Sequence, residues 1–217
     1  MSVDPRQQQL IAALGAELSP VRRLPPPWLR ALGWLLVVAV IATTLLLHHG
    51  AAPMLQRWAT ASDVAWSNAG AGLTAICAAW AACALAVPGR SRAWMLLPLP
   101  PALLWIGASG WGCLSGWLDP AASAAGGPPP QDCLVFIVGF SIPLSALMLW
   151  LLRRACPLRP VRAAILAGLA SAAAAASLMA IFHPIDVAAT DLLMHALAVG
   201  IVIAANAAMG NRLLSPR

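Results

Sequence analysis

Six long apolar segments divide this chain, and they constrain its fold more than any other feature. Each is close to the ~20 residues that an α-helix needs to cross the hydrocarbon of a bilayer. We expect spans at about 29–47, 64–87, 93–109, 132–152, 162–182 and 189–209. Because a backbone inside lipid must satisfy its own hydrogen bonds, the sequence predicts an all-α membrane protein built as a six-helix bundle.

The composition agrees with this membrane fold. Hydrophobic residues make up 61% of the chain and charged residues 9%, whereas a soluble domain of 217 residues needs more charge to cover its surface. The net charge of +6 comes from arginines that flank the spans and face anionic lipid headgroups. We therefore expect the lipid bilayer, and not nucleic acid, as the partner of these charges. The first apolar run follows a polar segment and is long enough to span, so we expect an anchor and not a cleaved signal peptide.

The arginines lie in alternate connections between the spans. They occur before the first span, between the second and third, between the fourth and fifth, and after the sixth, while the other three connections hold only Arg57. Basic residues are retained on the cytoplasmic side of a membrane. The pattern predicts a multi-pass inner-membrane protein with both termini in the cytoplasm.

Small residues and prolines distinguish individual spans. The second and fifth spans are rich in Gly, Ala and Ser, which let helix backbones approach closely, so we expect them at the centre of the bundle. Pro98, Pro100 and Pro101 predict a kink or break in the third span. The glycine- and proline-rich run 126–130 predicts that residues from about Ser109 to Gln131 form an outside loop.

Residues 4–19 have the pattern of a short amphipathic helix on the cytoplasmic side, with Asp4 as its N-cap and Pro5 at its first position. The apolar residues at helical spacing on one face are Leu10, Ile11, Leu14 and Leu18. A basic, proline-rich connector with Arg22 and Arg23 follows. So short a helix is stable only when its apolar face is covered. Both the membrane surface and the groove of a cytoplasmic protein are suitable partners.

Side chains with metal-binding or redox chemistry gather near the outer face in this topology. They are Cys113, Cys133, His183, Asp186, Asp191 and His195. Cys113 and Cys133 face an oxidising compartment, where they are able to form a disulfide or to bind a soft metal. Asp191 and His195 are helical neighbours, and ionisable groups at this depth are costly. The residues suit either a periplasmic metal or redox sensor or an Asp–His pair that only orients its helix.

Other function classes have less support in the sequence. A small metal-handling transporter would use the same outer residues, but the chain has no visible inverted repeat and little charge inside its spans. We do not expect an enzyme, because the chain has no C-x-x-C motif, no serine nucleophile motif and no carboxylate cluster. A transmembrane scaffold would have much the same sequence.

Four stretches, in this order along the chain, match the pattern of a known family. The first is the apolar segment from Leu10 with its basic Pro-Pro-Pro-Trp connector, which ends at Trp28, and the second is the pair Cys133-Leu134. The third is the loop 153–160, with its Arg-Arg and Pro-x-x-Pro patterns, and the fourth is the C-terminal stretch Gly210-Asn211-Arg212-Leu213-Leu214. In these stretches and in its six spans the chain resembles the NrsF family of bacterial membrane anti-sigma factors, which sequester extracytoplasmic-function sigma factors.

The resemblance implies a division of the chain. Residues 1–27 would form a cytoplasmic segment that holds the sigma factor away from RNA polymerase, and residues 28–217 would form the membrane domain that receives a periplasmic signal. The implied sigma-binding residues are Leu10, Ile11, Leu14, Leu18, Arg22 and Arg23.

Sensing in the family is associated with periplasmic cysteines, one of them at the position of Cys133. This chain has His183 where the second cysteine would stand, and Met194-His195 in place of a Trp-Tyr-like pair. A disulfide between those two positions is therefore impossible. Three alternatives stay open: Cys113 replaces the missing partner, Cys133 and His183 bind a metal, or the sensing input differs.

Overall fold

The computed structural model describes residues 4–17, 23–118, 130–182 and 189–214, and its regular elements in these ranges are all helical. They are α1 (Pro5–Ala16), α2 (Pro27–His49), α3 (Ala52–Thr60), α4 (Ser62–Leu85), the 3₁₀ helix η1 (Arg92–Leu96), α5 (Leu99–Leu118), α6 (Pro130–Arg153), α7 (Pro160–Met179) and α8 (Ala189–Leu214). Within these ranges six helical segments are long and apolar enough to cross a membrane. The prediction of a helical fold with six helices long and apolar enough to span a membrane is confirmed for the described residues.

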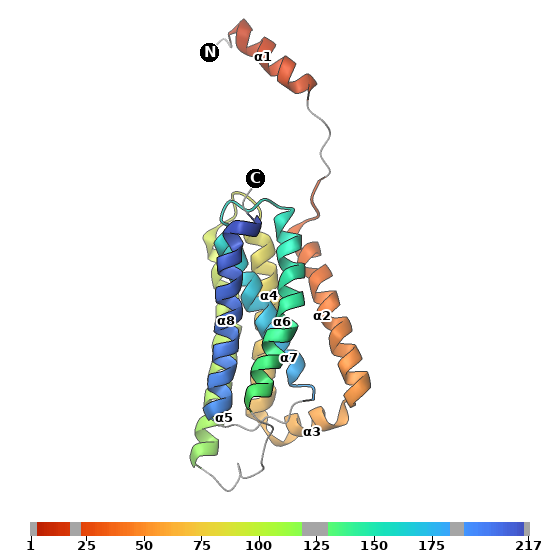
Figure 1. Ribbon diagram of the computed structural model, residues 1–217, viewed down its shortest axis with the longest axis vertical. Coiled ribbons are helices and arrows are strands. Elements are labelled where there is room, and N and C mark those ends of the chain that lie inside the picture. Colours follow the sequence, from red (N-terminus) through yellow and green to blue (C-terminus); the bar gives the residue numbers. More distant parts are fainter. Residues whose placement is uncertain (1–3, 18–22, 119–129, 183–188, 215–217) are drawn as a thin grey trace.

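The centre of the bundle is formed by α7, which packs against α4, α6 and α8 (Figure 1). The spanning window of α7 is 72% buried and that of α4 is 56% buried, whereas the other four windows are at most 33% buried. This confirms the central place predicted for the two Gly/Ala/Ser-rich spans. Small side chains allow the contact: a Cβ on Gly168 would lie 3.0 Å from the Cα of Ile203 in α8.

The third span is broken where the prolines predict. Its 3₁₀ turn η1 ends at Leu96, and α5 begins at Leu99 with Pro100 and Pro101 in its first turn. Proline is tolerated there because the first N–H groups of a helix have no intrahelical acceptor. The break therefore lies at the entrance of the span.

The outside loop predicted from Ser109 is shorter than expected. The helix α5 continues to Leu118, so the prediction is wrong for residues 109–118, and Cys113 lies in a helix and not in a loop. This stretch is apolar and contains no proline. A helix satisfies its backbone hydrogen bonds at membrane depth, and nothing in the stretch ends it.

A second difference is α3, a nine-residue helix that lies across one end of the bundle, where the sequence analysis expected a plain connection (Figure 1). Arg57 of α3 donates hydrogen bonds from Nη2 to the carbonyl oxygens of Ala180 and Ile181, each at 3.0 Å. These carbonyls follow the last turn of α7, where a helix leaves acceptors unsatisfied and its dipole is negative. The lone arginine of this end therefore has a structural role. We refer to it below as the α3 end.

The opposite end carries the arginine-rich connections. The ends of α4, α6 and α8 and the starts of α2 and α7 meet there (Figure 1). Arg92 lowers the pKa of Arg159, an effect to which desolvation and Arg162 add. Arginines from different connections thus lie close together, as a cytoplasmic face with retained positive charge would require. The orientation of the termini stays a prediction.

Candidate functional site

The helix α1 stands apart from the bundle, and all of its residues are exposed (Figure 1). The Asp4 side chain caps it by accepting a hydrogen bond from the backbone N of Arg6 at 3.0 Å. Leu10, Ile11 and Leu14 are 60%, 66% and 56% exposed. Three of the large apolar residues in the implied sigma-binding segment therefore have no cover from the described residues.

The remaining residues of the implied sigma-binding set lie in or beside the connector. Arg23 is exposed. Leu18 and Arg22 lie outside the described residues. The connector leads directly into α2, which has Pro26 as its N-cap residue and Pro27 at its first position.

Two directional contacts tie α2 to the bundle. Arg30 is buried, and its Nη2 donates a hydrogen bond to the carbonyl oxygen of Cys83 in α4 at 3.0 Å. Trp34 is fully buried, and its Nε1 donates to the carbonyl oxygen of Leu144 in α6 at 3.0 Å. Only 11% of the spanning window of α2 is buried. Any displacement of α2 relative to the bundle must therefore alter these contacts, which lie close to the point where the connector enters the membrane domain.

The structure brings together only some of the predicted sensing residues. Cys113 in α5 and His195 in α8 are both half-buried and line one cavity near the α3 end. Cys133 in α6 does not line this cavity but is fully buried in a cluster with Ile137 and Met179, and the structure records no disulfide between the two cysteines.

The metal prediction stays open. His183, Asp186 and the side chain of Asp191 lie outside what the structure describes. The described side chains contain no group of three or more His, Cys, Asp and Glu residues placed to hold a metal ion. Cys113 and His195 supply a thiol and an imidazole, which suit a soft transition metal, on the wall of the same cavity.

The cavity has a volume of about 620 Å³ and lies between α4, α5, α7 and α8. Most of its wall is apolar. Its polar side chains belong to Asp63, Ser67, Asn68, Ser109, Cys113 and His195. The hydroxyl groups of Ser67 and Ser109 lie 2.7 Å apart and join α4 to α5, while Asn68 Oδ1 is buried without a hydrogen-bond partner among the described residues. Apolar cavities of this size with a few polar groups are typical of small-molecule sites.

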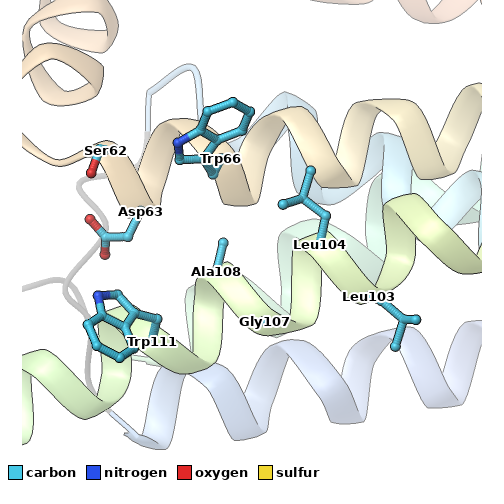
Figure 2. A pocket seen from close by; sticks show the side chains of 8 residues that line it. All are labelled: Ser62, Asp63, Trp66, Leu103, Leu104, Gly107, Ala108 and Trp111. Carbon is cyan, nitrogen blue, oxygen red and sulfur yellow. The ribbon is translucent and has the colours of Figure 1, made fainter.

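A second cavity, a groove of about 490 Å³, runs along the outside of α4 and α5 (Figure 2). Trp66 projects from α4 and Trp111 from α5, and they are 60% and 67% exposed. Asp63 lines this groove as well as the larger cavity. Among the described residues, the structure records no hydrogen bond or ion pair for the Asp63 carboxyl group.

The comparison with protein families decides the class of this protein. The family described as NrsF, negative regulator of sigma F, matches residues 14–215. The chain belongs to the NrsF family. No curated protein and no solved structure matches it. The predicted resemblance is confirmed, and membership makes the protein a negative regulator of a sigma factor, with a regulatory role and not a catalytic one.

The NrsF match extends from within α1 through the connector and the six spans. Sequence reasoning missed four functional candidates in this region. They are Arg30, Trp34, Asp63 and Trp66. Signals for two of them existed: Trp34 lies inside the first span and not at its boundary, and Asp63 is one of only seven acidic residues in the chain.

Proposed function

We propose that this NrsF protein holds an extracytoplasmic-function sigma factor at the bacterial inner membrane through residues 1–27, and so keeps it from RNA polymerase. The main support is α1, in which Leu10, Ile11 and Leu14 are exposed on one face. Apolar surface left in water costs roughly 25 cal/mol per Å², and a helix of twelve residues is marginal alone. An apolar groove on the sigma factor would cover this face and stabilise the helix.

The connector strengthens the proposal. Arg22 and Arg23 follow α1 and would lie beside the same partner surface, where they favour acidic side chains. Residues 17–26 join α1 to α2, the helix that carries Arg30 and Trp34. A change in the packing of α2 would then alter the position or the exposure of the binding segment.

The test is a matched pair of substitutions in the full-length protein. We expect Leu14→Ser to weaken binding of the sigma factor by about tenfold or more, because burying one leucine contributes roughly 1.5–3 kcal/mol. Ala12→Ser places the same side chain on the opposite face of α1 and should leave binding unchanged. The partner is first recovered with the wild-type protein in detergent and identified by mass spectrometry. Its affinity for each variant is then measured by titration.

Two results would contradict the proposal. One is recovery of no sigma factor with the wild-type protein. The other is equal affinity of the two variants for a sigma factor that is recovered, since this would place the contact outside the apolar face of α1.

We further propose that a soft metal or an oxidant acting at the periplasmic face releases the sigma factor. Cys113 and His195 support this input because they line one cavity at the end opposite the arginines. A ligand shifts a conformational equilibrium only when it binds one state more tightly. The metal or oxidant would therefore have to stabilise the arrangement of α5 and α8 in which α1 no longer holds its partner.

For release, we expect Cys113→Ser to abolish the response of a sigma-dependent reporter to a soft metal or an oxidant, because serine lacks the thiolate that these inputs require. Cys77→Ser is the control, since Cys77 is also half-buried but does not line the cavity. Basal repression should be unchanged in both variants. A normal response from the Cys113 variant would exclude this thiol as the input.

A further inference from the structure

We propose that the α3 end of α4 and α5 binds a lipophilic organic cation, an ammonium group on an apolar chain, with the Asp63 carboxylate as its counter-ion. This site goes beyond sigma-factor regulation and does not depend on it. Asp63 lines both cavities of this region, and among the described residues it is the only Asp, Glu or Arg on either wall.

Two hydrogen-bond acceptors near the start of α4, the Asp63 carboxylate and Asn68 Oδ1, favour a ligand that is a cationic hydrogen-bond donor. The structure records no hydrogen bond or ion pair for the Asp63 side chain among its described residues, and Arg57 of the preceding helix, α3, donates to carbonyl oxygens at the end of α7. Asn68 Oδ1 lies buried on the wall of the larger cavity without a donor from the described residues. A carboxylate and an amide oxygen that lack donors are complementary to an ammonium group.

The indole rings beside Asp63 favour the same ligand. Trp66 and Trp111 line the groove from its two helices, with Asp63 between their attachment points at its end (Figure 2). The face of a tryptophan ring attracts organic cations, and aromatic residues with a carboxylate recognise quaternary ammonium groups. Tryptophans that only anchor a helix at the membrane interface need no acidic residue between them.

The larger cavity provides room for the apolar chain. It is walled by four helices, and apart from its polar end its lining is formed by residues such as Ala71, Leu169 and Ile203. Gly200 lies on this wall, and a Cβ added there would meet no atom within 4 Å. A side chain added at Gly200 would therefore meet open space, and the ligand chain would lie along α8.

The test uses the full-length protein in an uncharged maltoside detergent, with dodecylammonium, whose head group has three N–H donors, as the probe below its micellar concentration. We expect saturable binding by calorimetry. Asp63→Asn should weaken it by about tenfold or more, because a hydrogen-bonded ionic partner is lost. The double variant Trp66→Ala/Trp111→Ala lacks both indole rings and should bind the probe roughly threefold to thirtyfold more weakly. Trp28→Ala removes a similarly exposed tryptophan at the arginine-rich end and should have no effect.

A second pair of variants tests the position of the chain. Gly200→Leu fills the larger cavity and should abolish probe binding. Gly110→Leu adds the same side chain to open space on α5 outside either cavity, and should leave binding unchanged. Equal binding by these two variants would overturn the assignment of the chain to this cavity.

Native mass spectrometry identifies the source of the cation. Retention of phosphatidylethanolamine over phosphatidylglycerol, lost in Asp63→Asn, would support the site with a membrane lipid as its ligand. Probe binding without such retention would support it with a free amphiphile. Absence of saturable probe binding, or equal binding by the wild type and Asp63→Asn, would overturn the proposal.

Discussion

Trp34→Ala is expected to destabilise the membrane domain by about 3–5 kcal/mol, as typical for loss of a buried tryptophan. Trp34 is fully buried among α2, α4 and α6, and its indole fills space beside alanines that cannot expand to replace it. The substitution also removes the hydrogen bond from Nε1 to the carbonyl oxygen of Leu144. The measurement is the free energy of unfolding in mixed micelles with increasing denaturing detergent, followed by circular dichroism.

Two control variants separate the contribution of the buried Trp34 ring from that of its hydrogen bond and from the loss of any exposed indole. Trp34→Phe retains most of the ring volume but not the donor, so we expect a loss of only about 0.5–1.5 kcal/mol, the net value of one hydrogen bond. Trp28→Ala removes an indole from the same helix that is 53% exposed, and it should change stability little. If Trp28→Ala were as destabilising as Trp34→Ala, the packing of Trp34 would not be what holds α2 to the bundle.

The same variant links the packing of α2 to regulation. Because α1 is attached to α2 through a short connector, loosening Trp34 gives the binding segment more conformational freedom. Ordering a freer segment costs more conformational entropy when it binds. We therefore expect the sigma factor to bind Trp34→Ala less tightly than Trp28→Ala, although neither substitution touches α1.

The features that could be predicted from the sequence are those set by a single segment. Apolar length predicted six spans, small residues predicted the central helices, and prolines predicted the break before Leu99. Asp4 and Pro5 predicted where α1 begins. Each of these depends on local chemistry or on the lipid environment, which acts on every span alike.

The features that sequence reasoning missed depend on contacts between distant residues. Trp34 and Leu144 are 110 positions apart, and Arg57 and Ala180 are 123 apart. No local pattern distinguishes Trp34 from an interfacial tryptophan until α6 is placed beside it. The sharing of Asp63 by two cavities likewise depends on how α4 packs against α5, α7 and α8.

Gly70→Ala is expected to destabilise the protein by about 1–3 kcal/mol, the usual cost of overpacking. A Cβ at this position would lie 2.6 Å from the backbone N of Trp105 and 2.8 Å from its Cα. Backbone atoms cannot rotate away as a side chain can, so α4 and α5 would have to separate. That movement would also stretch the 2.7 Å contact between the hydroxyl groups of Ser67 and Ser109, which lies on the wall of the larger cavity.

Gly72→Ala is the matched control for this prediction, two positions along the same helix. Its Cβ would lie 3.5 Å from Ser177 Oγ, an ordinary van der Waals contact. Alanine is favoured over glycine in a helix by about 1 kcal/mol, so this variant should be neutral or more stable than the wild type. The two variants therefore share the gain in helix propensity and differ in the clash with Trp105. Equal midpoints of thermal unfolding in detergent would show that α5 does not pack against Gly70 this closely. A lower midpoint confined to Gly70→Ala would support the close α4–α5 contact that shapes both cavities around Asp63.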